Sequence, residues 1–366
     1  MTTALNASTA GQFSEITWTS SGAVITATAD TAGTPFTATS AESGGAGTIG
    51  DYSATTANAS PNDVNDANNW SAGTLPADAE DIYFNERSNV PVYWNLDALS
   101  GINPNSVTIT AAYTGQIGLK SINDFGTAYP EYRARYLQFD AEAGGTPLTI
   151  GQGIGQCSGM IRMLLGSTGV WTITVFNTAS STETARQAVS IYGPSTNTVL
   201  THVGGSVGIA ELGGETMTIA TLTCGPAQQG ASTPDLILAT GCTLTTVSLD
   251  QAQLQLAAAV TTLNHKSGTT YITGSGAITT LSVQAGLLQH QGTGTITTLR
   301  IGTGATMNFG AAGAAITVTN AVQMYSGAAY IDPTYRASLG AGIVLNQCRI
   351  SDVTIDIGSN RTLTPS

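Results

Sequence analysis

A four-residue motif recurs through the second half of the chain, and it restricts the fold more than any other sequence feature. The motif is an apolar residue, two threonines and a second apolar residue, and full copies occupy 244–247, 260–263, 278–281 and 296–299. A degenerate copy lies at 316–319, and 209–212 and 219–222 resemble weaker members of the series. Successive copies from residue 244 onward are 16, 18, 18 and 20 residues apart. This length is too short for a propeller blade and too long for one hairpin strand, but it is typical of one coil of a β-helix.

Each full copy is followed by alternating apolar and polar residues, for example at 281–283. Alternation with period two predicts a strand with one buried face. We therefore expect stacked rungs about 4.8 Å apart. One inward column should contain Val247, Leu263, Leu281 and Leu299. His265 falls at the position that Leu249 and Val283 hold in other rungs, so we interpret it as an inward, hydrogen-bonded core histidine rather than a metal ligand.

The predicted fold is all-β. It comprises an N-terminal β-rich attachment and capping domain at 1–145, a single-stranded right-handed parallel β-helix at 146–347, and a C-terminal cap or tail at 348–366. The solenoid should begin near Leu148, with a loop inserted into one rung at 225–230. The frame of a leucine-rich repeat is absent. A left-handed hexapeptide helix stays open as an alternative, because only the lack of a strict six-residue period argues for the right hand.

The composition agrees with an all-β chain. Only 9% of the 366 residues are charged, against roughly 25% in a typical globular protein. Threonine and valine favour half-buried strands, and the 43 glycines supply tight turns. The Leu, Glu, Lys and Arg residues that a helical protein would need are not abundant.

Negative charge is concentrated in the first part of the chain. Residues 1–150 contain 15 acidic and 4 basic side chains, a net charge of −11, whereas 151–366 contain 8 and 7, a net charge of −1. A sequence pI near 4.4 argues against nucleic-acid binding through a basic surface and against attraction to anionic lipid. Two interpretations stay open: a solvated surface that keeps the protein soluble, or an acidic face that docks on a basic partner.

The sequence carries no signal for secretion or for a membrane span. Its polar start lacks the basic and apolar regions of a signal peptide, and no stretch approaches about 18 uninterrupted apolar residues. We therefore expect synthesis in the host cytoplasm. The cysteines form no CxxC pair, which argues against a disulfide scaffold and a standard zinc site. They are Cys157, Cys224, Cys242 and Cys348.

Most aromatic residues lie before residue 140, so the first half should have a core of its own. Alternating runs at 16–18 and 23–28 predict strands, and 61–70 is rich in residues that favour turns. The expected core set is Trp70, Tyr83, Phe84, Tyr93 and Trp94.

Several segments between about residues 15 and 215 form a distinctive series. They are Ile16-Thr17-Trp18, 28–37, Asn68-Asn69-Trp70, 73–76, 114–119, 129–133 and 136–137. In this order they resemble a largely uncharacterised family of structural proteins from tailed-bacteriophage virions. The resemblance implies a β-helical virion component of the capsid-decoration or cement kind. It supplies no catalytic residues.

Glycoside cleavage needs a pair of carboxyl groups. Acidic residues are scarce in the repeat region. Between residues 200 and 331 the acidic residues are Glu211, Glu215, Asp235 and Asp250. Glu211 and Glu215 flank a Gly-Gly turn, and we interpret them as a solvated rim. We therefore expect a protein that is not an enzyme, without catalytic residues.

Metal and cofactor motifs are also absent. His202, His265 and His290 follow no metal-ligand spacing and lie near no GxSxG motif. The glycines at 274–276 predict a solenoid corner, because no helix follows them to bind a phosphate. A cluster of acidic residues could bind calcium, which prefers oxygen ligands. Its spacing lacks the usual DxDxDG frame. The cluster contains Asp63, Asp66, Asp78, Glu80 and Asp81. We expect no metal and no cofactor.

These observations favour a non-enzymatic virion structural protein that binds the outer capsid surface. Its expected partner is the major capsid protein of a tailed phage, and we expect a homo-oligomer, with a trimer favoured. Neither nucleic acid nor membrane is an expected partner. The alternative is a tail or head fibre, or a spike, that binds a host receptor. A bacterial surface adhesin is disfavoured by the missing signal peptide.

Overall fold

The computed structural model describes residues 1–8, 11–31, 36, 61–87, 89–120, 133–142, 144–166, 169–179 and 187–358. The chain is nearly all β, with 4% helix, and a β-solenoid of about 12 turns extends from residue 81 onward. The predicted fold class is confirmed. The hand of the coil stays a prediction.

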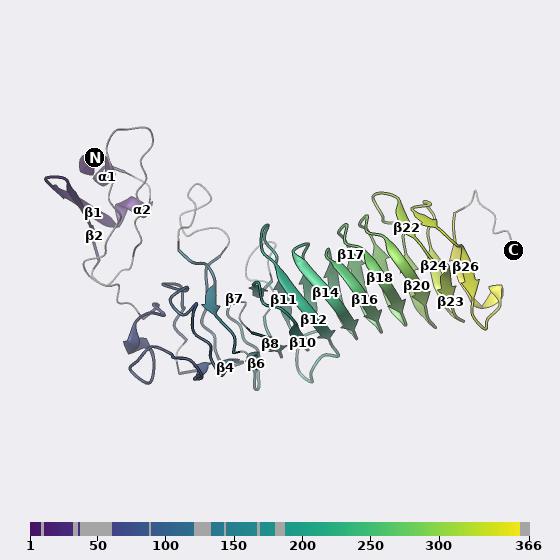
Figure 1. Ribbon diagram of the computed structural model, residues 1–366, viewed down its shortest axis with the longest axis horizontal. Helices are drawn as coiled ribbons and strands as arrows, with labels where there is room; N and C mark the ends of the chain where they lie inside the picture. The colour runs from purple at the N-terminus through teal and green to yellow at the C-terminus, as the bar shows by residue number, and fades with distance from the viewer. Residues whose placement is uncertain are drawn as a thin grey trace.

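Two long sheets form the solenoid, and from β4 to β22 successive strands alternate between them along the axis (Figure 1). Strands that neighbour each other within a sheet pair in parallel. Among the described residues, the first sheet contains β3 (Asp81–Phe84), β4 (Ser106–Thr110), β6 (Thr146–Gln152), β8 (Trp171–Val175), β10 (Thr198–His202), β12 (Met217–Cys224), β14 (Cys242–Leu249), β16 (Ala259–His265), β18 (Ile278–Val283), β20 (Ile296–Ile301), β22 (Ile316–Val318), β23 (Val322–Met324), β25 (Ala337–Leu339) and β26 (Ile343–Leu345). The second sheet contains β5 (Leu137–Phe139), β7 (Ile161–Leu165), β9 (Val189–Tyr192), β11 (Ser206–Ile209), β13 (Asp235–Leu238), β15 (Ala252–Leu256), β17 (Gly268–Ile272), β19 (Gly286–His290), β21 (Ala305–Asn308), β24 (Ala329–Ile331) and β27 (Thr354–Asp356).

Two short helices and a hairpin precede the solenoid, and they lie at the opposite end of the molecule from β26 (Figure 1). They are α1 (Thr2–Asn6), α2 (Gly11–Ser14), β1 (Ile16–Ser21) and β2 (Val24–Ala29). The strands pair antiparallel, which confirms the strands expected at 16–18 and 23–28. The Asn6 side chain joins α1 to β1, since its amide donates to the Trp18 carbonyl at 2.8 Å and its oxygen accepts the Trp18 N–H at 2.7 Å.

The predicted inward column is confirmed. Val247 pairs with Leu263, Leu263 with Leu281, and Leu281 with Leu299. All four side chains are fully buried. The column therefore lies in the core between the two sheets.

The two threonines of the motif mark a stacked β-bulge. In β18 the pairing with both neighbours passes from Ile278 to Thr280 and omits Thr279. The corresponding residues Thr245 and Thr261 are omitted in the same way. A bulge adds one residue without a ladder partner, so Ile278 and Leu281 both face inward although they are three residues apart. Two outward residues must lie between them, and in the full repeats both are threonine.

The predicted boundary at 145/146 is wrong, because the first sheet of the solenoid begins earlier. β3 pairs with β4, and β4 pairs with β6, all in parallel. These early strands lack the threonine motif and are joined by longer, irregular connections, so no repeat marks them in the sequence. The predicted loop at 225–230 does lie between two strands, β12 and β13.

The C-terminal end and the weaker motif copies also differ from expectation. Part of the predicted cap at 348–366 continues the solenoid, because β27 pairs with β24; residues 359–366 lie outside the described part. The 316–319 copy belongs to the first sheet, but Val318 rather than Ile316 pairs with Ile296. In the 219–222 copy, Ile219 pairs with Leu244 and Leu222 with Val247, as the motif predicts. The 209–212 copy instead begins in the second sheet, where Ile209 pairs with Leu238.

The aromatic core of the first half is confirmed only in part. Trp70 packs edge-on against Phe84, and Phe84 against Tyr113, with ring centroids 6.2 and 5.9 Å apart. Tyr83 is 57% exposed, because β3 turns Ile82 and Phe84 inward and the residue between them outward. Sequence position alone did not establish which face of this short strand is buried.

Candidate functional site

The structure does not place Glu211 and Glu215 on a solvated rim, and that interpretation was wrong. Glu215 is 8% exposed. Its carboxylate accepts the Tyr136 hydroxyl at 2.6 Å and the Leu212 N–H at 3.0 Å. Glu211 is half-buried and accepts the Gln187 N–H at 3.0 Å. Both carboxylates therefore hold chain segments together.

A groove of about 460 Å³ lies beside Glu215. Tyr136 and Tyr192 meet edge-on at its surface, with ring centroids 4.6 Å apart. Arg133, which also lines the groove, places its guanidinium 4.2 Å from the ring centre of Trp94. The cation and the carboxylate both have partners within the fold, which favours a structural role for these groups.

The acidic cluster considered for calcium is used to fix loops. Asp63 is 2% exposed and accepts the Asn65 N–H at 2.8 Å and the Asn95 amide at 2.7 Å. Asp66 caps the short 3₁₀ helix Ala67–Asn69. The other members each accept a hydrogen bond from a backbone or side-chain donor: Asp78, Glu80 and Asp81. No group of three potential metal ligands occurs among the described residues.

The three histidines are buried in the core. His265 lies in the expected column, paired with Leu249 and Val283, and its Nδ1 is 2.9 Å from the Thr270 hydroxyl. Its interpretation as a hydrogen-bonded core residue is confirmed. Burial lowers the pKa of His202, His265 and His290 to about 4, so all three are neutral at pH 7.

The cysteines are unpaired thiols within the fold. Cys157, Cys224 and Cys242 are buried, and Cys348 is half-buried. Burial raises the pKa of Cys157 to about 11 and that of Cys242 to about 12. Such thiols stay protonated at neutral pH and pack as small apolar groups.

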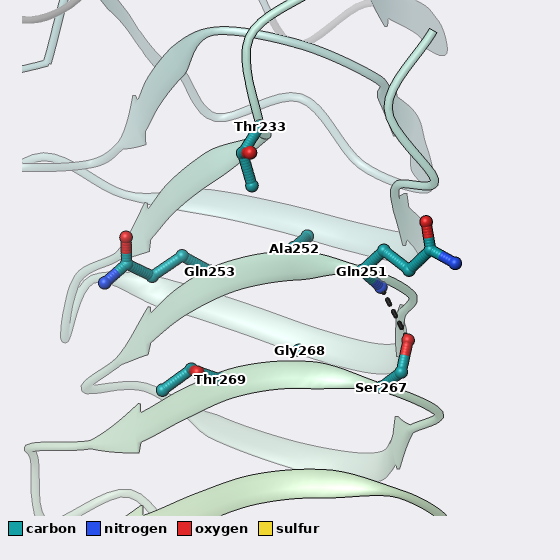
Figure 2. A pocket seen from close by; sticks show the side chains of 7 residues that line it. All are labelled: Thr233, Gln251, Ala252, Gln253, Ser267, Gly268 and Thr269. Carbon is teal, nitrogen blue, oxygen red and sulfur yellow. Dashed lines mark hydrogen bonds between the residues drawn. The ribbon is translucent and has the colours of Figure 1, made fainter.

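A second, shallow groove of about 430 Å³ opens on the outer surface of the second sheet (Figure 2). Figure 2 shows Ala252 and Gly268 between two rows of polar side chains. One row contains Gln253 and Thr269, and the other contains Gln251 and Ser267. The Ser267 hydroxyl accepts the Gln251 N–H at 2.8 Å and donates to Asp250 at 2.7 Å, which fixes one wall.

The sequence interpretation missed this groove, although its signal is visible. Glutamines alternate with apolar residues at 251–256, and such alternation places them on the outer face of a strand. The expected corner at 274–276 is confirmed between β17 and β18. A side chain on the stacked Gly292 would collide with the carbonyl of Gly274.

The isolated protein should not cleave glycans. The reaction needs two suitably placed carboxyl groups, and Glu211 and Glu215 both hold structural hydrogen bonds. Incubation with purified host polysaccharide should release no reducing ends above a buffer blank. Release that is lost in a Glu215→Gln variant with unchanged circular dichroism would contradict this expectation.

None of the helices in the described residues is long and apolar enough to cross a membrane. Comparison with known protein families, curated proteins and solved structures finds no match for this chain.

Proposed function

We propose that this protein is a non-enzymatic structural component of a bacteriophage virion, which decorates the outer capsid surface and stabilises it. The observation that carries the proposal is the uneven charge of the chain, whose second half is a regular β-solenoid of nearly zero net charge. Residues 1–150 have a net charge of −11 and residues 151–366 a net charge of −1. The resemblance of several segments within residues 15–215 to phage virion proteins supports the same assignment.

The acidic part of the chain would face basic residues of the major capsid protein. Exposed ion pairs contribute only about 0–1 kcal/mol each, so most affinity would come from buried apolar area and from many equivalent sites on the shell. Val24 and Ile25 of the hairpin are 65% and 42% exposed and offer apolar contacts at the same end. Bridging neighbouring capsid subunits would raise the resistance of the shell to internal pressure. We expect a homo-oligomer, with a trimer favoured.

The alternative is a tail or head fibre, or a spike, that binds a host receptor. One observation favours it: the N-terminal hairpin and the last described strands of the solenoid, such as β26, lie at opposite ends of the molecule (Figure 1). An N-terminal anchor would leave the far end of the solenoid exposed to a receptor. Image reconstruction of the virion separates the two functions, because copies over the whole shell support decoration and a few copies at the tail tip support receptor binding.

Neutralising two acidic residues near the N-terminal end should slow capsid binding. Glu86 and Asp97 are exposed, so the double variant Glu86→Gln, Asp97→Asn should fold normally. At low salt we expect its association rate with undecorated particles to fall several-fold, because charge steers encounter more than it sets final affinity. Surface plasmon resonance on immobilised particles measures this rate.

The matched control is the double variant Asp352→Asn, Asp356→Asn, which removes two exposed charges near the other end of the solenoid. It should leave the association rate unchanged. An equal effect of both variants, or no effect of either, would reject docking through the acidic end. Intact chains are needed for this test, because cutting at 145/146 would divide the solenoid between β4 and β6.

A further inference from the structure

The outer surface of the second sheet carries uncharged hydrogen-bonding side chains in register across several rungs. Gln253 pairs with Thr269 in β17. In the next outward column, Gln255 pairs with Tyr271, and Tyr271 pairs with Gln289. Asn308 of β21 continues that column. We call these residues the amide strip: Gln253, Gln255, Thr269, Tyr271, Gln289 and Asn308.

The amide strip adjoins the shallow groove, since Gln253 and Thr269 belong to both (Figure 2). Gln253 and Gln255 are exposed, and Tyr271 is half-buried between its neighbours. The opposite wall adds the Gln251 side chain and the Ser267 hydroxyl. Together the two features form a surface of amides, hydroxyls and one aromatic ring, in which Leu287 lies beside Thr269 and Ile237 beside Gln255.

The surface carries few formal charges: Asp235 pairs with Gln253 at one end of the strip, and Asp250 accepts the Ser267 hydroxyl beside the groove. Residues 251–331 contain no acidic side chain, and their basic residues are Lys266 and Arg300. Arg300 lies in β20, in the other sheet. A nucleic acid needs several cations to neutralise its phosphates, and an anionic polysaccharide would need them for the same reason. The charge therefore matches a neutral ligand.

The side chains also match the chemistry of sugars. Each glutamine side chain offers N–H donors and an acceptor oxygen, and a sugar hydroxyl can pair with either because it both donates and accepts. The tyrosine ring offers an apolar face with a polar edge, against which the C–H face of a pyranose can stack. A second copy of the chain fits less well, because protein interfaces have apolar centres. The large apolar side chains that pair with the strip, Ile237 and Leu287, are half-buried.

We propose that the groove and the amide strip bind a neutral polysaccharide, without cleaving it. This activity goes beyond capsid decoration and does not depend on it. The site would hold a linear chain of neutral pyranose units across successive rungs.

The test is isothermal titration of the full-length protein with maltohexaose, cellohexaose and chitohexaose, and with hexagalacturonate as the anionic comparison. At least one neutral hexasaccharide should bind at millimolar concentration. Tyr271→Ala and Gln253→Ala should each weaken that binding, the former by about tenfold or more. The controls are Asn264→Ala and Ser282→Ala, which alter the outer face of the other sheet and should bind like the parent protein.

Four results would overturn the proposal. They are no binding of any neutral sugar by the folded parent protein, equal or tighter binding of hexagalacturonate, binding that Tyr271→Ala and Gln253→Ala leave unchanged, and self-association that either variant abolishes in analytical ultracentrifugation. Circular dichroism of each variant separates loss of the site from loss of the fold. Capsid binding is measured separately, so failure here leaves the decoration proposal intact.

Discussion

Replacing Leu281 with aspartate should prevent the protein from folding. Leu281 is fully buried and pairs with Leu263 on one side and Leu299 on the other. The substitution removes a core side chain, at a cost of roughly 2–5 kcal/mol, and adds a carboxylate that no cation can reach in that column. A typical domain is stable by only about 5–15 kcal/mol. Since each rung depends on its neighbours, the loss should spread along the solenoid.

The control is Ser282→Asp, one residue further along the same strand. Ser282 faces outward and is half-buried, so a charge there can stay hydrated and should change stability far less. Soluble yield, far-ultraviolet circular dichroism and urea denaturation compare the two variants. A Leu281→Asp protein with the parent's urea midpoint would refute the inward column.

Acid should destabilise the protein through its buried histidines. The pKa of each of the three is lowered to about 4, mainly by burial, from an ordinary value of 6.5. As the pH falls from about 6.5 toward 4, the unfolded chain binds protons that the folded chain cannot, so the free energy of unfolding decreases. The stabilisation that the neutral histidines contribute is fully present above about pH 6.5 and is lost progressively toward pH 4. At pH 5 the loss is roughly 2 kcal/mol per histidine, or about 6 kcal/mol for the three.

Among the described residues, the other groups with a clear pKa shift near this pH range do not cancel the effect. Cys224, whose sulfur lies 3.6 Å from His202 Nδ1, has its pKa raised by burial and stays neutral. Asp235 acts in the opposite direction, because burial raises the pKa of its carboxyl, but it is a single, half-buried group. Hydrogen bonds from Ser106 and Asn105 lower the pKa of Asp81, which places its titration below the histidine window.

His290→Ile isolates one third of the effect. Within the described residues neither ring nitrogen of His290 has a hydrogen-bond partner; the carbonyls of Gly292 and Gly294 oppose the pKa shift without reaching bonding geometry. The neighbouring rung already has Ile272 at this position. We expect the variant to be at least as stable as the parent at pH 7.5 and clearly more stable at pH 5, by urea denaturation at both values. An unchanged difference between the two pH values would show that His290 does not titrate as described.

The sequence predicted the regular rungs because their signal is local and repeated. Four copies of one motif placed Val247, Leu263, Leu281 and Leu299 in a single column, and pairing confirms it. The bulge at Thr279 was missed, because a pair of threonines looks the same in a straight strand and in a bulged one. The early strands β3 and β4 were assigned to another domain, because irregular connections hide their period.

Contacts between distant parts of the chain were the least predictable. Tyr136 and Glu215 are 79 residues apart, yet they form a hydrogen bond that decides whether the carboxylate is buried. No spacing rule brings these two residues together. The groove at Gln253 could have been found, because its glutamines follow the same alternation that located the core.

The stacked register also determines how the length of this molecule can change. Ile278 and Ile296 hold equivalent positions 18 residues apart, and so do Leu281 and Leu299. Loss or duplication of one such unit would rejoin the chain with its inward columns and its bulge still aligned. The rod would then shorten or lengthen by one strand spacing, about 4.8 Å, while both ends kept their own sequences. The length of the rod can therefore evolve in discrete steps, independently of the sequences at its two ends.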